Sequence, residues 1–477
     1  MHTNHHSLTK IIATIGPACN TKETLRKMIH EGIDVVRLNF SHGKHTDHEP
    51  VIRIIKELNL ELGTNVAILA DLQGPKLRIG EVENNGVILE NGSHIKFVSE
   101  ECIGSAERVF MSYKPLPVDV NPGETILVDD GKIKLEVVST NRINEVTLKV
   151  ISGGKLSSKK GVNLPNTNIS LPSLTEKDIN DANYVLDFDI DWIALSFVRN
   201  AKDIAGLREL IHKKNKHTKI IAKIEKPEAI ADIDNIIDAT DGVMIARGDL
   251  GVETPFNQVP ILQKQIVHKC ILKSKPVIIA TQMMESMITN FRPTRAEATD
   301  VANAVIEGAD ALMLSGETSV GEYPTGVIRA MQDVISATEN KGFELSHNHE
   351  PDPRNHSYLP DSVCYNACKM ADLTGAKGIV VFTYGGGSAF KVASNRPKGN
   401  IYAFTPFKNV MTQLNLIRGV QSFYLEPEST INDSIKVATH ILKQNKLIKA
   451  DDVMVFIGGI PMVEKGPVNM MKIVKVL

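Results

Sequence analysis

At 477 residues, the chain exceeds the roughly 250–300 residues at which a single hydrophobic core stops growing, so two or three domains are expected. Hydrophobic residues make up 42% of the chain and charged residues 23%, which are the proportions of an ordinary soluble globular protein. The formal net charge of −2 argues against nucleic acid and against an anionic membrane as partners, and no apolar run approaches the roughly 18–20 residues that span a bilayer. The five cysteines are scattered and the N-terminal segment is polar, so we expect a cytoplasmic protein without a disulfide framework.

Short apolar runs recur along the chain, and most of them are followed by a helical pattern. Nearly continuous apolar character is typical of parallel strands covered on both faces. Eight such runs alternate with helical stretches, which predicts an α/β fold built on a (β/α)8 TIM barrel. The predicted strands are Lys10–Ile15, Ile33–Leu38, Val66–Ala70, Trp192–Phe197, Lys219–Ile224, Gly242–Ala246, Pro276–Ala280 and Ala309–Leu314. The predicted helices include Lys22–His30, His45–Leu62, Asp203–Lys214, Pro227–Ala239, Val259–Lys273 and Arg295–Glu307, the last with a capping box of Thr294 and Glu297.

Polar residues follow every one of the eight predicted strands. The C-terminal strand ends of a barrel meet on one face, which is where barrel enzymes place their chemistry. A single polar residue at a strand end is often a satisfied loop group, but eight together favour an active site. These positions are Gly16-Pro17, Asn39–His42, Asp71, Arg199, Glu225, Arg247–Asp249, Thr281-Gln282 and Ser315–Glu317.

Two stretches depart from the strand–helix alternation. Between Gly74 and about Leu171, Val- and Ile-rich segments with turn signals predict a small β-barrel lid inserted after the third strand. Beyond the polar linker Ser346–Pro360, strands predict a separate α/β domain; they are Gly378–Thr383, Asn400–Phe404, Val420–Leu425, Val453–Ile457 and Ile473–Leu477. The expected domains are a catalytic barrel of residues 1–73 and 172–345, a lid of residues 74–171 and a C-terminal effector domain of residues 346–477.

Glu225 and Asp249 stand at neighbouring strand ends of the predicted barrel. Magnesium commonly takes one or two protein carboxylates and completes its shell with water and substrate oxygens. The two acids therefore predict a site for a hard divalent cation. The alternative is that each acid forms an ion pair within its own loop.

Cationic side chains are expected in the same place. Lys223 lies two residues before Glu225, so both side chains share one face of the strand. A lysine inside a barrel needs negative charge, which a phosphoryl group, an enolate oxygen or a neighbouring carboxylate would supply. Arg37, Asn39 and Ser41 likewise share a face, and arginine suits bidentate phosphate recognition. The pattern predicts a site for anionic substrates.

A glycine-rich turn stands in the predicted C-terminal domain. Gly385-Gly386-Gly387-Ser388 follows a strand and opens a helix, where backbone N–H groups can hold a phosphate. A tight turn between a strand and a helix is the alternative interpretation.

Ordered motifs along nearly the whole chain resemble those of the pyruvate kinase family. They are Lys10–Ala18 (KIIATIGPA), Val36–Gly43 (VRLNFSHG), Ala70–Arg78 (ADLQGPKLR), Lys223–Pro227 (KIEKP), Met244–Glu253 (MIARGDLGVE), Ala280–Met287 (ATQMMESM), Arg292–Glu297 (RPTRAE) and Met313–Thr318 (MLSGET). The resemblance implies transfer of a phosphoryl group from phosphoenolpyruvate to ADP, giving pyruvate and ATP in the last step of glycolysis. It also implies a Mg²⁺ or Mn²⁺ cofactor and a homotetramer.

The resemblance assigns roles to individual residues. The implied metal ligands are Glu225 and Asp249, and the implied catalytic residues are Lys223, Arg37, Thr281 and Ser315. The implied substrate-binding residues are Arg37, Lys223, Arg247, Gly248, Asp249 and Thr281, and the nucleotide-binding residues are Thr14, Pro17, Asn39, His42, Arg78 and Lys160. The sequence leaves open which group or water protonates the enolate carbon near Thr281 and Ser315.

Two motifs depart from the family. Many members carry Thr-Lys-Gly-Pro-Glu after the third-strand aspartate, where the threonine and the glutamate serve a potassium ion. Here the run is Leu72-Gln73-Gly74-Pro75-Lys76, so we expect the Lys76 ammonium to fill the monovalent-cation position and potassium not to be required. That position is formed by Asn39, Ser41 and Asp71.

The second departure concerns the effector loop, which is hydroxyl-rich in the family. Here it keeps only its two end residues. A phosphorylated effector is expected at Thr383, Gly385, Gly386, Gly387 and Ser388, and its identity is left open.

Two other functions are compatible with parts of this pattern. Carbon–carbon lyases of the phosphoenolpyruvate/pyruvate barrel superfamily also hold magnesium with a Glu and an Asp, but they lack the inserted lid and the Arg-x-Asn-x-Ser run. A non-catalytic metabolite sensor would be expected to lack a metal ligand, and neither Glu225 nor Asp249 is missing.

Overall fold

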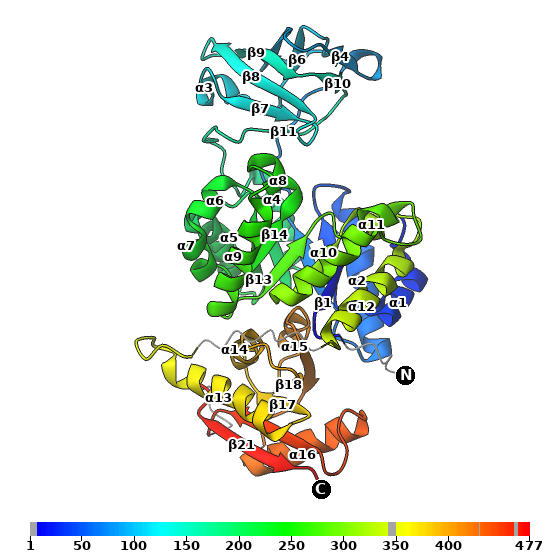
Figure 1. Cartoon of the computed structure of the whole chain (residues 1–477), viewed down its shortest axis with the longest axis vertical. Helices are drawn as coiled ribbons and strands as arrows, with labels where there is room; N and C mark the ends of the chain where they lie inside the picture. The colour runs from blue at the N-terminus through cyan, green and yellow to red at the C-terminus, as the bar shows by residue number, and fades with distance from the viewer. Residues whose placement is uncertain (1–6, 342–349, 429, 462–465) are drawn as a thin grey trace.

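The computed structural model describes residues 7–341, 350–428, 430–461 and 466–477. Figure 1 shows three parts stacked along the long axis, with a β-rich part at one end, a barrel in the middle and an α/β part at the other end. The expected boundary between residues 345 and 346 lies outside the described residues. Among the described helices, none is both long enough and apolar enough to cross a membrane.

The middle part is a closed barrel of eight parallel strands, in the order β1-β16-β15-β14-β13-β12-β3-β2. Almost every residue in these strands is buried, as the apolar runs predicted. Each predicted strand overlaps an observed one, and the ends differ by only a few residues. The strands are β1 (Lys10–Thr14), β2 (Val35–Asn39), β3 (Ala67–Asp71), β12 (Trp192–Leu195), β13 (Lys219–Ile224), β14 (Gly242–Ala246), β15 (Val277–Ala280) and β16 (Ala311–Leu314). The TIM-barrel prediction is confirmed.

Helices surround the barrel and bury their apolar faces against it (Figure 1). They are α1 (Lys22–Glu31), α2 (His45–Leu62), α4 (Glu176–Leu186), α5 (Ala201–Lys213), α6 (Pro227–Ala231), α7 (Ile233–Ala239), α8 (Arg247–Glu253), α9 (Val259–Leu272), α10 (Arg295–Glu307), α11 (Gly316–Ser319) and α12 (Pro324–Glu339). The predicted capping box is present, because Thr294 Oγ1 accepts from Glu297 N and the Glu297 carboxylate accepts from Thr294 N.

One predicted helix is wrong. The pattern predicted a single helix over Pro227–Ala239, but the structure breaks it at Asp232, whose φ of −106° and ψ of 18° lie outside the helical range. The Asp232 carboxylate accepts hydrogen bonds from Ala201 N and Asn235 Nδ2. Short acidic side chains that bond locally compete with helix continuation, and the helical period does not register this.

The insertion between β3 and α4 forms two sheets around one apolar core, and we call it the lid. One sheet has the order β11-β7-β8-β9-β5-β6 and the other pairs β10 with β4. The strands are β4 (Val87–Leu89), β5 (His94–Val98), β6 (Arg108–Phe110), β7 (Thr125–Val128), β8 (Ile133–Thr140), β9 (Glu145–Ser152), β10 (Gly154–Leu156) and β11 (Val162–Asn163). Two short helical turns, η1 (Glu83–Asn85) and α3 (Leu116–Asp119), complete it.

A single carboxylate ties the two chain segments that lead into and out of the lid. Asp178 Oδ1 accepts from Gly74 N at 3.1 Å, and Asp178 Oδ2 accepts from Thr175 N at 3.0 Å. Gly74 has a φ of +68°, and a Cβ there would stand 2.8 Å from the Phe197 ring, so only glycine fits this position. The entry and exit of the lid are therefore fixed to the start of α4.

The C-terminal part is a five-stranded sheet in the order β19-β18-β17-β20-β21, with only the edge strand β21 antiparallel. Its strands are β17 (Gly378–Phe382), β18 (Asn400–Thr405), β19 (Val420–Tyr424), β20 (Val453–Gly458) and β21 (Met470–Lys475). Its helices are α13 (Tyr358–Thr374), α14 (Gly387–Ser394), α15 (Lys408–Leu414) and α16 (Ile431–Gln444). The separate α/β unit expected from the sequence is confirmed.

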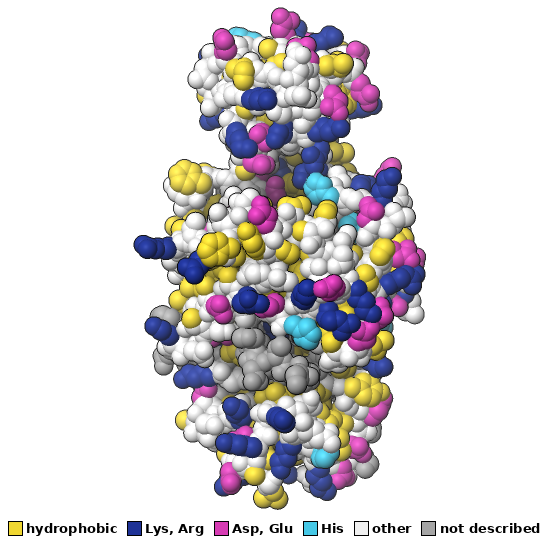
Figure 2. All heavy atoms as spheres, turned by 90° about the vertical axis from the view of Figure 1, so that its right-hand side faces the viewer, with side chains coloured by type: hydrophobic (Ala, Val, Ile, Leu, Met, Phe, Trp, Pro, Cys, Tyr) yellow, Lys and Arg dark blue, Asp and Glu magenta, His cyan; other side chains and the backbone are white. Residues whose placement is uncertain are grey.

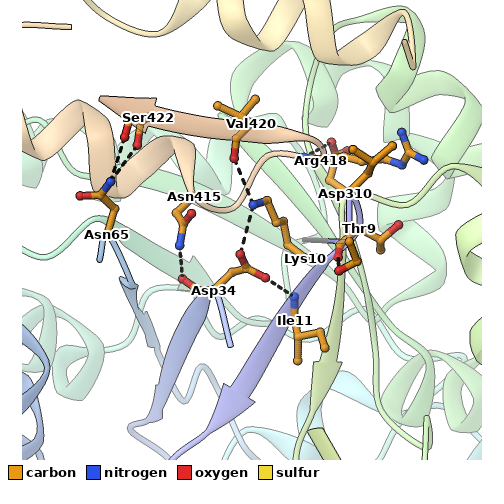
Figure 3. A network of polar contacts seen from close by, with 12 residues as sticks. Thr9, Lys10, Ile11, Asp34, Asn65, Asp310, Asn415, Arg418, Val420 and Ser422 are labelled. Carbon is orange, nitrogen blue, oxygen red and sulfur yellow. Dashed lines mark hydrogen bonds and ion pairs between the residues drawn. The ribbon is translucent and has the colours of Figure 1, made fainter. Parts of the chain in front are cut away.

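The barrel contacts the C-terminal part at the N-terminal ends of its strands, opposite the lid (Figure 3). Lys10 Nζ donates to Val420 O at 3.1 Å and lies 3.1 Å from Asp34 Oδ1. Asn65 Nδ2 donates to Ser422 O at 3.1 Å. Strands β1 and β19, which are far apart in sequence, are thus joined through buried polar contacts.

Candidate active site

The C-terminal face of the barrel gathers the predicted catalytic residues. This face lies under the lid, and Figure 2 shows charged side chains of both signs at the narrow junction between the two parts. Each predicted residue stands on or directly after a barrel strand: Arg37 on β2, Lys223 and then Glu225 at β13, Asp249 in α8 after β14, Thr281 after β15 and Ser315 after β16.

Asp71, the last residue of β3, is the shared counterion of two cations. Its Oδ2 accepts from Arg37 Nε at 2.7 Å, and its Oδ1 lies 3.2 Å from Lys223 Nζ. Arg37 Nη1 also donates to Thr14 Oγ1 at 3.0 Å. Asp71 is 1% exposed, so this arrangement is held away from water. The sequence assigned Asp71 to a monovalent-cation position, and its bonds to Arg37 and Lys223 were not foreseen.

Lys223 is held by three oxygen-bearing groups. Besides Asp71, it lies 2.9 Å from Glu225 Oε1 and donates to Ser196 Oγ at 2.7 Å. Ser196 follows β12 and was missed, because in the sequence it is a lone serine between Leu195 and Phe197. The sharing of one strand face by Lys223 and Glu225 was predicted and is confirmed.

The charges in this cluster perturb one another. Burial works to raise the pKa of the Asp71 carboxyl, but the positive charges of Lys223 and Arg37 outweigh it and leave that pKa below its usual value. Burial works to lower the pKa of Lys223, but the negative charges of Asp71 and Glu225 outweigh it. The pKa of Lys223 is therefore above its usual value, and the ammonium stays charged. Burial, with the like charge of Asp249, raises the pKa of Glu225 against the opposing effect of Lys223.

The two predicted metal ligands are electrostatically close. Asp249 acts on Glu225 as a like charge, which a divalent cation between them would relieve. Glu225 Oε2 accepts from Phe197 N at 2.7 Å, which fixes the orientation of the carboxylate. Two carboxylates, Glu225 and Asp249, form a donor set that fits an ion such as Mg²⁺, which takes one or two carboxylates and fills its shell with substrate and water oxygens.

The segment Arg247–Asp249 faces a strained turn after β15. Thr281 and the next residue, Gln282, have φ values of 70° and 54°, which non-glycine residues rarely adopt. Gly248 N donates to Thr281 Oγ1 at 2.8 Å, and Arg247 Nη2 donates to Thr281 O at 2.8 Å. The Arg247 side chain is held on its other side by Asp300 Oδ1 at 2.8 Å. The Arg247 side chain and the Gly248 N–H thus both hold the turn after β15.

Ser315 is positioned by Glu317, a buried acid to which the sequence analysis assigned no individual role. Ser315 N donates to Glu317 Oε2 at 2.7 Å, and Met284 N donates to Glu317 Oε1 at 3.2 Å. Glu317 is fully buried, so its carboxylate joins the loops that follow β15 and β16. Its place in the motif Ser315-Gly316-Glu317 was the available signal, but nothing in the motif shows which oxygen meets which N–H.

The predicted nucleotide-side residues are divided between barrel and lid. Burial, followed by the positive charges of Lys76, Arg78 and Arg37, lowers the pKa of His42, so these side chains lie near one another. Arg78 Nη1 donates to Lys159 O at 2.9 Å. Within the lid, Lys160 Nζ is 2.9 Å from Asp129 Oδ1. In the barrel, Thr14 Oγ1 donates to Leu314 O at 2.8 Å, and Asn39 Oδ1 accepts from Ser41 N at 3.1 Å. Pro17 is exposed.

Lys76 lies in a cavity of about 60 Å³ between barrel and lid. Burial and the charge of Arg78 lower its pKa, and Asp249 opposes them. Among the described residues, Lys76 Nζ forms no ion pair with Asp71, whose carboxylate is occupied by Arg37 and Lys223. The charged groups that act on Lys76 are Arg78 and Lys223 as well as the two predicted metal ligands, Asp249 and Glu225, and they do not include Asp71.

The glycine-rich turn lines a cavity of about 380 Å³ in the C-terminal part. Thr383 Oγ1 accepts from Gly386 N at 3.1 Å, and Gly386 has a φ of 84°, so the turn closes tightly before α14. Four of the five predicted residues line the cavity, and Gly386 does not: the lining includes Thr383, Gly385, Gly387 and Ser388 together with Lys391 and Glu426, which the sequence analysis missed. The Lys391 ammonium is paired with Asp361.

Comparison with known proteins places this arrangement in a family. The model of the pyruvate kinase barrel domain matches residues 6–328, and the model of the pyruvate kinase alpha/beta domain matches residues 361–474. The chain is 41% identical to a pyruvate kinase of Corynebacterium glutamicum, over 98% of this chain and 97% of the relative. It is 38% identical to a pyruvate kinase of Mycobacterium tuberculosis, over 97% of both chains. A crystal structure of a pyruvate kinase from Cryptosporidium parvum superposes with a TM-score of 0.92 at 34% identity, covering 100% of this chain and 97% of the other. With a closed barrel, an inserted lid and these relatives, the chain belongs to the pyruvate kinase family of phosphotransferases.

Proposed function

We propose that this chain transfers the phosphoryl group of phosphoenolpyruvate to ADP, giving pyruvate and ATP. The observation that carries the proposal is the buried cluster in which Arg37 and Lys223 share the Asp71 carboxylate beside Glu225. It sets two fixed cations next to Glu225, one of the two predicted metal ligands, as a reaction between two anionic substrates requires. The full-length relatives named pyruvate kinases support the same assignment.

The charges of the substrates set the main barrier to their meeting. Two like unit charges about 4 Å apart repel by roughly 4 kcal/mol at an effective dielectric constant near 20. Glu225 and Asp249 would hold a Mg²⁺ or Mn²⁺ ion, whose charge would offset part of this repulsion and polarise the phosphoryl oxygens. Arg37 binds the phosphoryl group of phosphoenolpyruvate, and Asp71 keeps the guanidinium oriented for that contact.

The transfer itself breaks one P–O bond and forms another. A terminal phosphate oxygen of ADP attacks the phosphorus in line, and the bond to the enol oxygen breaks. Lys223 stabilises the negative charge on the phosphoryl and enolate oxygens, because its raised pKa keeps it protonated. The enolate then takes a proton at its terminal carbon near Thr281 and Ser315, and pyruvate results.

The remaining predicted roles follow the same geometry. The backbone of Gly248 and Asp249 binds the carboxylate of phosphoenolpyruvate, with Arg247 and Thr281 holding that segment in place. The nucleotide lies between barrel and lid, with its phosphates against Arg78 and Lys160 and the remainder against Thr14, Pro17, Asn39 and His42. Potassium is not required, because the Lys76 ammonium supplies a tethered monovalent charge near the metal-site acids.

Regulation and assembly are further parts of the proposal. A phosphorylated effector binds the cavity beside Gly387 and Ser388, where the start of α14 offers backbone N–H groups. A homotetramer and a cytoplasmic location stay predictions from the family resemblance.

An assay of pyruvate and ATP formation, with phosphoenolpyruvate, ADP and Mg²⁺, tests the proposal directly. Equal amounts of both products, and none without ADP, are expected. Pyruvate formed without ADP, when a substrate with a larger carbon skeleton replaces phosphoenolpyruvate, would favour the carbon–carbon lyase. No turnover together with ligand-induced stabilisation would favour the metabolite sensor.

A further inference from the structure

Glu253 is a buried acid to which neither the predicted chemistry nor the comparisons assign a role. It ends α8, four residues after Asp249, so the two carboxylates leave the same side of one helix. Glu253 is 4% exposed. A charge at such depth is retained only where it is paired, so its partners indicate what it does.

The first partner of Glu253 is the residue that follows the other metal-type acid. Lys226 Nζ donates to Glu253 Oε1 at 2.8 Å, and Lys226 is also 4% exposed. Lys226 comes directly after Glu225 and caps the start of α6. The ion pair therefore ties the segment that carries Glu225 to the helix that carries Asp249. Their separation depends on this buried contact as well as on the pairing of β13 with β14.

The second partner belongs to the lid. Asn163 Nδ2 donates to the same Glu253 Oε1 at 2.9 Å. Asn163 comes three residues after Lys160 and lies in β11, which pairs with β7. The lid also approaches α8 next to Glu253, because a Cβ added at Gly131 would stand 3.8 Å from Val252 Cγ1. One carboxylate oxygen thus receives a donor from the barrel and a donor from the lid.

The second oxygen of Glu253 supports a functional reading. Oε2 is buried and accepts no hydrogen bond within the described part of the chain. A buried acceptor without a partner destabilises the folded state, so a neutral or apolar side chain would suit a merely structural position better. Glu253 also lines the cavity that Lys76 and Asp249 line, so its side chain lies on the same side of α8 as the predicted metal ligand.

We propose that Glu253 is a positioning residue that fixes the lid relative to the two carboxylates of the predicted metal site. Through Lys226 it fixes the distance between Glu225 and Asp249, and through Asn163 it fixes the strand that follows Lys160. The nucleotide phosphates that the lid binds are then correctly positioned relative to the substrate bound at Glu225 and Asp249. This inference rests on the proposed function for its kinetic part, and its metal-binding part is measured without turnover.

Asn163→Ala tests the lid contact alone. The KM for ADP should rise about tenfold, whereas the KM for phosphoenolpyruvate and the Kd for Mn²⁺ alone, measured by electron paramagnetic resonance, should stay within twofold. Asn144→Ala, in the exposed β8–β9 turn of the lid, is the matched control and should change none of these values. An unchanged KM for ADP in Asn163→Ala would overturn the lid half of the inference.

The double variant Lys226→Met with Glu253→Leu tests the metal half. Replacing both members of a buried ion pair by apolar residues avoids leaving one charge unpaired, so the fold should be kept. The Kd for Mn²⁺ alone should rise at least tenfold, and adding Asn163→Ala should raise the KM for ADP no further. A double variant with wild-type Mn²⁺ affinity and wild-type KM for ADP would show that Glu253 is only structural. A wild-type chain that binds Mn²⁺ at these residues but forms no pyruvate would instead contradict the proposed function.

Discussion

Lys223 Nζ and Glu225 Oε1 lie 2.9 Å apart at the end of β13, so the cation proposed to face the transferring group is paired with a predicted metal ligand. The lysine has a second counterion in Asp71 at 3.2 Å. The loss of the Glu225 charge would therefore not leave Lys223 unpaired. The two roles of Glu225, as counterion and as metal ligand, can be separated by mutation.

Glu225→Gln should lower turnover by about 10²–10³-fold, because it removes one of two carboxylate charges from the metal site. The amide oxygen can still accept from Phe197 N, and Lys223 keeps Asp71, so the melting temperature should change little. Pyruvate formation as a function of Mg²⁺, together with Mn²⁺ binding, measures the effect. Asp249→Asn should behave in the same way. Near-normal turnover of either variant at limiting Mg²⁺ would contradict the metal assignment.

The barrel and the positions of its site residues were predictable because both depend on local patterns. Apolar runs gave the eight strands to within a few residues, and polar residues after each strand marked the C-terminal face. Contacts between distant segments were not predictable. Ser196, for example, bonds Lys223 across 27 positions, and Asn163 meets Glu253 across 90. No periodicity encodes such pairs, since they follow from barrel closure and from the docking of the lid.

Gly387→Asp should abolish activation by any phosphorylated effector while leaving basal turnover close to normal. A Cβ at Gly387 meets no atom within 4 Å, so the aspartate fits, and its charge repels a phosphate at the start of α14. Activation is measured by titrating sugar phosphates and nucleoside monophosphates. Gly387→Ala, which adds bulk without charge, is the control and should keep most of the activation. If Gly387→Asp is activated like the wild type, the turn is purely structural.

Asp191 should make the contact between barrel and C-terminal part sensitive to pH. Burial raises the pKa of this carboxyl to about 6, although Thr412 Oγ1 and Ile68 N both donate to it. A folded pKa above the usual value of about 3.9 means that the folded state binds the proton more tightly. Stability from this group is therefore present at low pH and is lost as the pH rises from about 4 through about 6, by at most roughly 3 kcal/mol.

Asp191→Asn should remove this dependence, because an amide can accept from Ile68 N and donate to Thr412 Oγ1 without ionising. Its melting temperature should exceed that of the wild type at pH 8 and approach it at pH 5. Asp189→Asn alters an exposed acid two residues away and should follow the wild type at both pH values. A constant difference between Asp191→Asn and the wild type at pH 5 and pH 8 would contradict the prediction.

Lys76 provides the test of potassium independence. The wild-type chain should be equally active in potassium salts and in salts of a large inert cation, because the ammonium already supplies a monovalent positive charge beside Asp249. Lys76→Glu should lose most activity, since it adds a negative charge near Glu225 and Asp249. Potassium should restore only part of that loss, because the buried Leu72 supplies no hydroxyl oxygen to a rebuilt cation site.

Lys76→Met separates charge from bulk. It removes the ammonium and keeps a side chain of similar length, so it should lose activity as Lys76→Glu does, but potassium should not restore it, because no carboxylate is added to bind the ion. Initial rates at fixed ionic strength, with the potassium fraction varied, measure both variants against the wild type. A wild-type requirement for millimolar potassium would contradict the role of Lys76 at once. Equal restoration of the Met and Glu variants would show that potassium acts somewhere other than beside residue 76.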